Sequence, residues 1–318
     1  MDEIVTSQVF NDADADVIFR SSDGVHFHLH KLILSKASSV FQGMFTLPSA
    51  PSHETAAVQV VQVTENAAVL EALFRLCYPM EHQRIEDLSL LRFALDAAHK
   101  YDMAFISEQL KANLRALVPS AALRVYCVAY LTKCADVAQD AARFLLGSYA
   151  LFDERNLPHE FEELPATALA KLIIYRKTCT GLAQWVLNDD EWMGSAILSE
   201  ALSSYPDDTT PWVWLTCDDC KTAEEYENPD PDDIVGQLVR PCAWWCLYRN
   251  AARDALSLEP TPTTVTQIRL MDSALRKAAS CKTCSPKAAS HLLRYAREVA
   301  DRIEEKISKV KLKLPFDE

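Results

Sequence analysis

Glycine is scarce in this sequence, with only six residues in a chain of 318. The tight turns that join hairpin strands usually need a residue with positive φ, so few of them can form. Alanine and leucine are abundant instead, and both favour helices. We therefore expect a mostly helical protein.

Basic residues and long apolar runs are also in short supply. The chain has 32 Lys and Arg against 45 Asp and Glu, a formal net charge of -13. Affinity for nucleic acids depends on clustered Lys and Arg, so we expect no binding to DNA or RNA. The acidic start at residues 1–3 lacks the basic and apolar regions of a secretion signal, and no run of eighteen apolar residues occurs. We expect no export signal and no membrane span.

The motifs of common enzymes are missing as well. The sequence has no glycine-rich phosphate loop, no nucleophile elbow and no His-Glu-x-x-His zinc motif. The paired carboxylates Glu162-Glu163 and Asp218-Asp219 lie in polar stretches that are typical of solvated surface. These absences predict a protein that is not an enzyme.

Cysteine, in contrast, is plentiful, with ten residues. Without an export signal they predict a reducing compartment, the cytoplasm or the nucleus. There they would act as buried apolar groups, metal ligands or reactive thiols instead of forming disulfides.

The chain is long enough for two domains, and its first third alternates strand and helix patterns. Residues 16–20 and 25–29 read as strands joined by a turn at Ser21-Ser22-Asp23-Gly24. Residues 32–45 predict two short helices broken at Ala37-Ser38-Ser39. A β-branched strand at 58–63, a helix at 67–77 ending at Tyr78-Pro79, and a helix from Leu88 to Ala98 complete the pattern.

An ordered series of residues runs through this stretch. It consists of Asp16-Val17-Ile18-Phe19, Phe27-His28-Leu29-His30-Lys31, Leu34, Ser38, Phe41, Met44-Phe45, Leu76-Cys77-Tyr78-Pro79, Leu91, Ala94, Ala97-Ala98, Lys100-Tyr101-Asp102-Met103 and Leu110. The series resembles the pattern of the BTB/POZ domain family over residues 14–118. The phrase from Ala97 to Met103 is similar to BTB proteins of basidiomycete fungi.

The resemblance implies an α+β fold, in which a small sheet capped by helices is followed by an all-helical C-terminal domain. It also implies association: BTB domains usually form two-fold homodimers through the first helix and the N-terminal strands. Asp16 and Lys31 match the family's charged pair near the dimer groove. The residues that could supply a strand exchanged between subunits are Ile4, Val5, Val9 and Phe10. We expect a homodimer that also scaffolds a protein partner whose identity the sequence does not give.

A second function is open under the same resemblance. Some BTB proteins are substrate adaptors of cullin-type ubiquitin ligases and carry a hydrophobic-x-Glu motif after the second helix. The nearest counterpart here is Ser52-His53-Glu54, with serine in the hydrophobic position. This departure disfavours a cullin as the partner, so adaptor function stands as the alternative.

The remainder of the chain reads as helical. Pro119-Ser120 predicts a break and an N-cap before two helices that end near Gly147 and resemble the BACK-type helices that follow many BTB domains, which sets a second region at 119–160. A cysteine- and tryptophan-rich domain follows at 161–318. Its expected helices cover 164–187, 241–256 and 285–312, the last capped by Ser285-Pro286, with loops at 205–216 and 228–233.

Two cysteine pairs are the sharpest feature of that domain. Cys217-x-x-Cys220 and Cys281-x-x-Cys284 have the spacing that lets two thiolates face one ion, and together they would complete a tetrahedral zinc site. The gap between the pairs is long for a compact zinc ribbon, so Cys179, Cys242 and Cys246 remain alternative ligands, and buried unliganded thiols remain an alternative to zinc. A redox pair is disfavoured because no strand of a βαβ unit precedes it.

Other clusters have ordinary explanations. All six tryptophans fall within residues 185–245, which predicts an aromatic core in preference to a peptide-binding groove. The apolar stripe of the last helix predicts domain packing in preference to a coiled coil. His26, His28 and His30 would share one face of a strand and could bind a metal, but His30 is expected to begin the first helix and so to break the triplet.

Overall fold

The computed structural model describes residues 5–47, 58–81, 84–148, 157–189, 212–220 and 241–316. The chain divides into two compact units. The first comprises Met1–Phe144, Glu154–Ala168 and Leu314–Glu318, and the second comprises Leu145–Asp153 and Leu169–Lys313. Within the described ranges, every helix is too short or too polar to cross a membrane. The predicted α+β class is confirmed.

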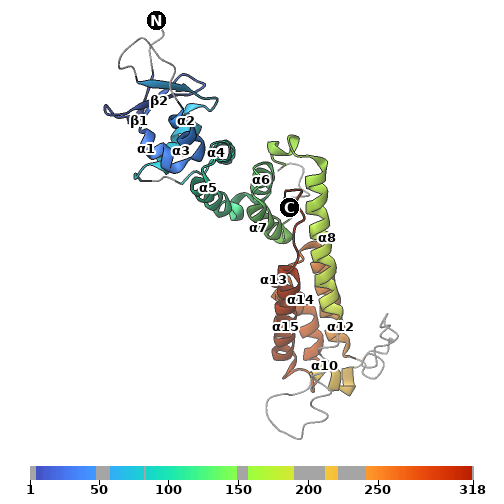
Figure 1. Cartoon of the computed structure of the whole chain (residues 1–318). Coiled ribbons are helices and arrows are strands. Elements are labelled where there is room, and N and C mark those ends of the chain that lie inside the picture. Colours follow the sequence, from blue (N-terminus) through green and yellow to red (C-terminus); the bar gives the residue numbers. More distant parts are fainter. Residues whose placement is uncertain are drawn as a thin grey trace. The chain divides into compact units, whose positions relative to one another are not determined.

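The first unit contains a small sheet (Figure 1). It has four strands in the order β1-β3-β2-β4. The strands are β1 (Thr6–Asn11), β2 (Val17–Arg20), β3 (His26–Leu29) and β4 (Gln59–Gln62). β2 and β3 pair antiparallel and form the predicted hairpin, while β1 and β4 add to it in parallel at opposite edges.

The hairpin turn follows from its residues. Gly24 has φ of +89°, a conformation that other residues adopt only with strain. The hydroxyl of Ser21 accepts a hydrogen bond from the backbone N–H of Val25 at 2.9 Å, which closes the turn. The carboxylate of Asp23 accepts from the N–H of Ala67 at 2.9 Å and so ties the turn to the start of the following helix.

Helices cover this sheet and continue beyond it. They are α1 (Lys31–Ala37), α2 (Ser39–Thr46), α3 (Ala67–Cys77), α4 (Leu88–Lys100), α5 (Ala104–Ala116), α6 (Val118–Leu131), α7 (Ala135–Phe144) and a short 3-10 helix η4 (His159–Glu162). The break between α1 and α2 is confirmed. The predicted break after Pro119-Ser120 is present as a kink at Ala121 (φ −148°, ψ 43°), but α6 already begins at Val118, with Pro119 in its first turn, so the predicted N-cap at Ser120 is wrong. Proline has no N–H to contribute, so it fits the first turn without breaking the helix there.

The core of the first unit is built from aromatic rings of α3 and of the strands β1, β2 and β3, which point away from solvent. Phe74 of α3 lies at its centre, with its ring centroid 5.6 Å from Phe19 of β2, 5.7 Å from Phe27 of β3 and 5.9 Å from Phe10 of β1. All four are buried. The contacts are edge-on, the arrangement that aromatic pairs prefer.

Replacement of Ser38 by alanine is expected to destabilise the first unit by about 2 kcal/mol. The buried hydroxyl caps α2 by accepting from the N–H of Phe41 at 3.0 Å, and it donates to the carbonyl of Tyr101. Its loss removes the cap and leaves that carbonyl without its partner. Urea unfolding followed by far-UV circular dichroism measures the change. Ser39→Ala is the matched control, because Ser39 is exposed; an equal effect of both variants would contradict the capping role.

The second unit is helical, as predicted. Its elements are η1 (Leu145–Gly147), α8 (Ala166–Asn188, whose first three residues belong to the first unit), α10 (Val213–Thr216), the 3-10 helix η5 (Asp218–Cys220), α12 (Ala243–Leu258), α13 (Pro262–Val265), α14 (Ile268–Ala279) and α15 (Ala288–Ser308). α12 packs on α14, and α14 on α15 (Figure 1). Gln184 of α8 donates to the carbonyl of Arg253 of α12 at 3.4 Å, which places these two helices together.

The predicted cap of the last helix at Ser285-Pro286 is wrong. α15 begins at Ala288 and ends at Ser308, short of Leu312. The carbonyl of Cys284 accepts from the N–H groups of both Lys287 and Ala288, so residues 281–287 form turns before the helix starts. The apolar stripe of α15 is buried in the unit, which confirms domain packing; it contains Leu292, Ala296, Val299, Ile303 and Ile307.

Candidate functional site

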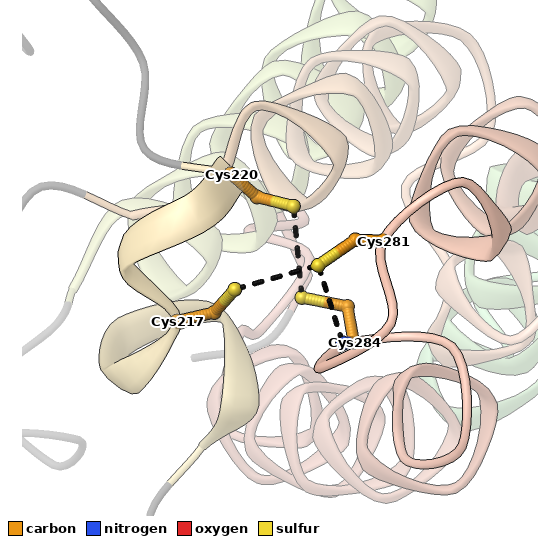
Figure 2. Close-up of side chains that lie close together, drawn as sticks. All are labelled: Cys217, Cys220, Cys281 and Cys284. Atoms are coloured by element: carbon orange, nitrogen blue, oxygen red, sulfur yellow. Dashed lines mark hydrogen bonds between the residues drawn. The ribbon is translucent and has the colours of Figure 1, made fainter.

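The two cysteine pairs converge in the second unit. Cys217 follows the last residue of α10, and Cys220 is the last residue of η5. The short segment between them therefore directs both thiol groups to the same side. Cys281 and Cys284 lie in the turn between α14 and α15. Figure 2 shows the four side chains pointing toward a common centre, two from each segment.

The sulfur atoms lie at distances that suit a shared ion. Sγ of Cys217 is 3.6 Å from Sγ of Cys281, and Sγ of Cys220 is 3.9 Å from Sγ of Cys284. All four sulfurs lie within 4.8 Å of one another. A disulfide would need about 2.05 Å, and all four residues are free cysteines. The structure therefore brings together the four residues that the sequence analysis selected as zinc ligands.

The surroundings lower the pKa of one of these thiols and raise the pKa of two others. The backbone N–H of Cys284 donates to Sγ of Cys281 at 3.5 Å, and this contact lowers the pKa of the Cys281 thiol to about 7. Burial raises the pKa of Cys220 and of Cys284. The indole N–H of Trp244 opposes the rise at Cys284.

Cys242 lies next to the cluster but outside it. Its Sγ is 4.0 Å from Sγ of Cys284, and its S–H donates to the carbonyl of Cys217 at 3.8 Å. Burial raises the pKa of this thiol. Among the described residues, neither Cys242 nor the other alternative ligands, Cys179 and Cys246, join the group whose sulfurs converge. The paired carboxylates Asp218-Asp219 and Glu162-Glu163 are exposed, as predicted.

Tryptophans form the core beside the cysteine cluster. The ring of Trp214 lies 5.9 Å from Trp245 and 5.8 Å from Trp244 between centroids, and all three are buried. Trp212 stacks on Trp214 at 4.6 Å. The predicted aromatic core is confirmed for these four. Trp185 falls outside this core, with 49% of its surface exposed, and Trp192 lies outside the described residues.

The sequence analysis missed His291 in this core. Its Nδ1 accepts a hydrogen bond from the N–H of Val213 at 3.1 Å, which holds the start of α10 against α15. Burial lowers the pKa of His291, so the ring stays neutral at neutral pH with its proton on Nε2. The available signal was its position next to Leu292, within the buried stripe of α15.

In the first unit, Asp16 and Lys31 meet through the backbone. The carboxylate of Asp16 accepts a hydrogen bond from the N–H of Lys31 at 2.7 Å and so caps the start of α1. The ammonium of Lys31 lies 5.6 Å from the centroid of Phe45. A carboxylate at a helix N-terminus is stabilised by the helix dipole. Asp16 therefore stabilises the start of α1 in its own chain.

The histidine triplet is broken as expected. β3 ends at Leu29, and His30 stands at the N-cap of α1. The backbone N–H of His30 donates to Oη of Tyr78 at 2.9 Å, and burial raises the pKa of Tyr78 to about 12. Nε2 of His30 lies 3.4 Å from a carboxylate oxygen of the exposed Asp14. Since exposed acidic groups are common without a metal, we assign no site there.

Comparison with known proteins bears on the first unit. The sequence profile of the BTB/POZ domain matches residues 7–116, the stretch that contains the sheet and helices α1 to α5. Residues 7–116 are a BTB/POZ domain. BTB domains are protein-interaction modules that mediate self-association and the binding of protein partners, and they are not typically enzymatic. A search of curated proteins gave no significant match to the chain.

Proposed function

We propose that the chain is a non-enzymatic scaffold that forms a homodimer through its BTB domain and uses its helical unit to hold a protein partner. The observation that carries the proposal is the apolar surface of the BTB domain at its first helix and N-terminal strand. Leu32 of α1 is 71% exposed and Val5, directly before β1, is 58% exposed. Both side chains lie on the elements through which BTB domains usually dimerise, so each could bury its apolar surface against a second copy.

The exchanged strand is a separate part of this proposal. β1 pairs with β3 of its own chain, and Phe10 is buried in its own domain. In an exchanged dimer β1 would make the same pairing with the partner's β3, so a self-complementary, two-fold interface would result. Ile4 lies outside the described residues. Asp16 and Lys31 would lie near the groove as α1 approaches its counterpart, which keeps them candidates for partner contact.

The purified protein is expected to sediment as a dimer. At micromolar concentration, sedimentation equilibrium should give a mass of about twice 35.7 kDa. Leu32→Asp places a charge in the middle of the proposed interface and should raise the dimer dissociation constant about thirtyfold or more, the effect of about 2 kcal/mol expected at a hot spot.

Phe105→Asp is the matched control for this experiment. Phe105 is 73% exposed in α5 of the same domain, so the substitution adds the same charge at the same exposure away from α1. Wild-type protein that sediments as a monomer, or equal weakening by both variants, would overturn the proposed interface.

The adaptor function remains a second prediction. Its motif, Ser52-His53-Glu54, lies outside the described residues, and binding of a cullin-type scaffold rests on the family resemblance alone. We place the protein in the cytoplasm or nucleus, supported by ten cysteines that are all free. The similarity to fungal BTB proteins likewise stays a prediction.

A further inference from the structure

We propose that Cys217, Cys220, Cys281 and Cys284 bind one zinc ion, which acts as a structural centre of the helical unit. Four thiolates in a tetrahedron are the ligand set that selects zinc, with tetrahedral iron as the main competitor. The proposal concerns the second unit only and is independent of self-association through the BTB domain.

The first step of the argument is distance. A zinc ion with Zn–S bonds of about 2.3 Å at the centre of a tetrahedron sets its sulfurs about 3.8 Å apart. The two contacts across the cluster, Cys217 to Cys281 and Cys220 to Cys284, are 3.6 Å and 3.9 Å. These contacts each join one pair to the other, so neither pair forms a site alone (Figure 2).

The second step is the direction of the side chains. Cys217, Cys281 and Cys284 are buried, while the residues between the members of each pair are exposed. Those exposed residues are Asp218, Asp219, Lys282 and Thr283. Cysteines buried only as apolar groups would more often sit among apolar neighbours in a regular helix. Here each pair instead lies in a surface turn that folds its two sulfurs inward.

The third step is the need for a cross-link at this place. α10 has four residues and η5 has three, which is far below the length at which a helix is stable by itself. Trp214 anchors α10 in the tryptophan core, whereas η5 reaches the turn between α14 and α15 through the bond from Thr283 to the carboxylate of Asp219 at 3.2 Å. A metal bound by both pairs would fix α10 and η5 to the turn between α14 and α15.

The fourth step is charge. Zinc with four thiolates carries two net negative charges, and on binding, each ligand thiol gives its proton to the solvent. A donor already faces one of the sulfurs: the backbone N–H of Cys284 lies 3.5 Å from Sγ of Cys281. Such donors around the ligands orient and stabilise metal sites.

The test is metal content of the full chain, purified with a thiol reductant and without chelator. Elemental analysis should find about one zinc per chain. Cobalt added to the metal-free protein should bind in a ratio of about one and give the visible and near-ultraviolet bands of a tetrahedral thiolate site. Both measurements use the wild-type protein, so a variant that fails to fold does not affect them. Zinc well below one per chain together with no cobalt spectrum, or iron in place of zinc, would overturn the proposal.

Variants then identify the ligands. Cys284→Ser should lose most of the zinc, and Cys242→Ser should keep it, because Cys242 is a buried cysteine beside the cluster that contributes no ligand. Equal loss in both variants would contradict this ligand set. Removal of the ion by a chelator should lower the urea midpoint of the second unit and leave the sedimentation mass unchanged. Unfolding that is the same with and without zinc would refute a structural role.

Discussion

Trp214→Ala is expected to destabilise the second unit by about 3–5 kcal/mol, the cost of truncating a fully buried aromatic side chain. Trp214 has no exposed surface and joins α10 to α12 and α15 through its contacts with Trp244, Trp245 and Tyr295. The cavity would lie beside the cysteine cluster, so zinc affinity should fall as well. With a urea dependence of 1–3 kcal/mol per molar, the midpoint should drop by roughly 2 M.

Tryptophan fluorescence isolates this transition. All six tryptophans lie within residues 185–245, so the signal reports the second unit and is blind to the BTB domain. Trp185→Ala removes the same side chain from a position that is 49% exposed, where the ammonium of Lys306 lies over the ring, at 4.8 Å. It should shift the midpoint much less. Comparable shifts in both variants would show that Trp214 is not central to the core.

Local signals explain why the first unit could be predicted element by element. The helix predicted at 67–77 has those bounds in the structure, because Asn66 caps its start by accepting from the N–H of Val69 at 3.0 Å and Tyr78-Pro79 ends it. The hairpin and the break at Ser38 likewise depend on residues that act within a few positions. Where a signal was ambiguous, as with proline at 119 and 286, the predicted helix start was displaced.

The second unit was less predictable because its signals are weaker or not local. α13 and α14 were not anticipated, although the buried face of α14, made of Met271, Ala274 and Ala278, follows helical spacing that the sequence analysis overlooked. The spacing within each cysteine pair indicated a metal ligand. That the pairs meet across 64 residues depends on how α14 and α15 pack, which spacing cannot encode.

The way in which the two cysteine pairs meet distinguishes the four proposed ligands from Cys242, the fifth cysteine near the site. In the sequence, Cys242 was an alternative ligand to the two pairs, since any free thiol can bind zinc. In the fold it begins the first turn of α12, and its S–H is directed to the carbonyl of Cys217. Tertiary structure thus leaves one thiol out of the set, and that thiol supplies the control that distinguishes a metal site from a cluster of buried cysteines.

Phe74→Ala is expected to destabilise the BTB domain by about 3–5 kcal/mol. The ring is 1% exposed and touches rings from three strands, so its removal opens a cavity at the centre of the sheet-facing core. Because Phe10 of β1 packs on Phe74, the substitution also removes a contact that holds β1, the strand proposed for exchange. The dimer should therefore weaken together with the domain, although position 74 itself is buried and lies outside the proposed interface.

Far-UV circular dichroism and sedimentation measure the two effects, while tryptophan fluorescence should show an unchanged midpoint for the second unit. Phe93→Ala is the matched control, since Phe93 of α4 is 52% exposed in the same domain. Substitutions of exposed residues usually change stability by less than about 0.5 kcal/mol. A Phe74→Ala protein that unfolds at a lower urea concentration yet sediments as the full dimer would show that self-association does not depend on the BTB core. That result would contradict dimerisation through the BTB domain and would point to the helical unit as the interface.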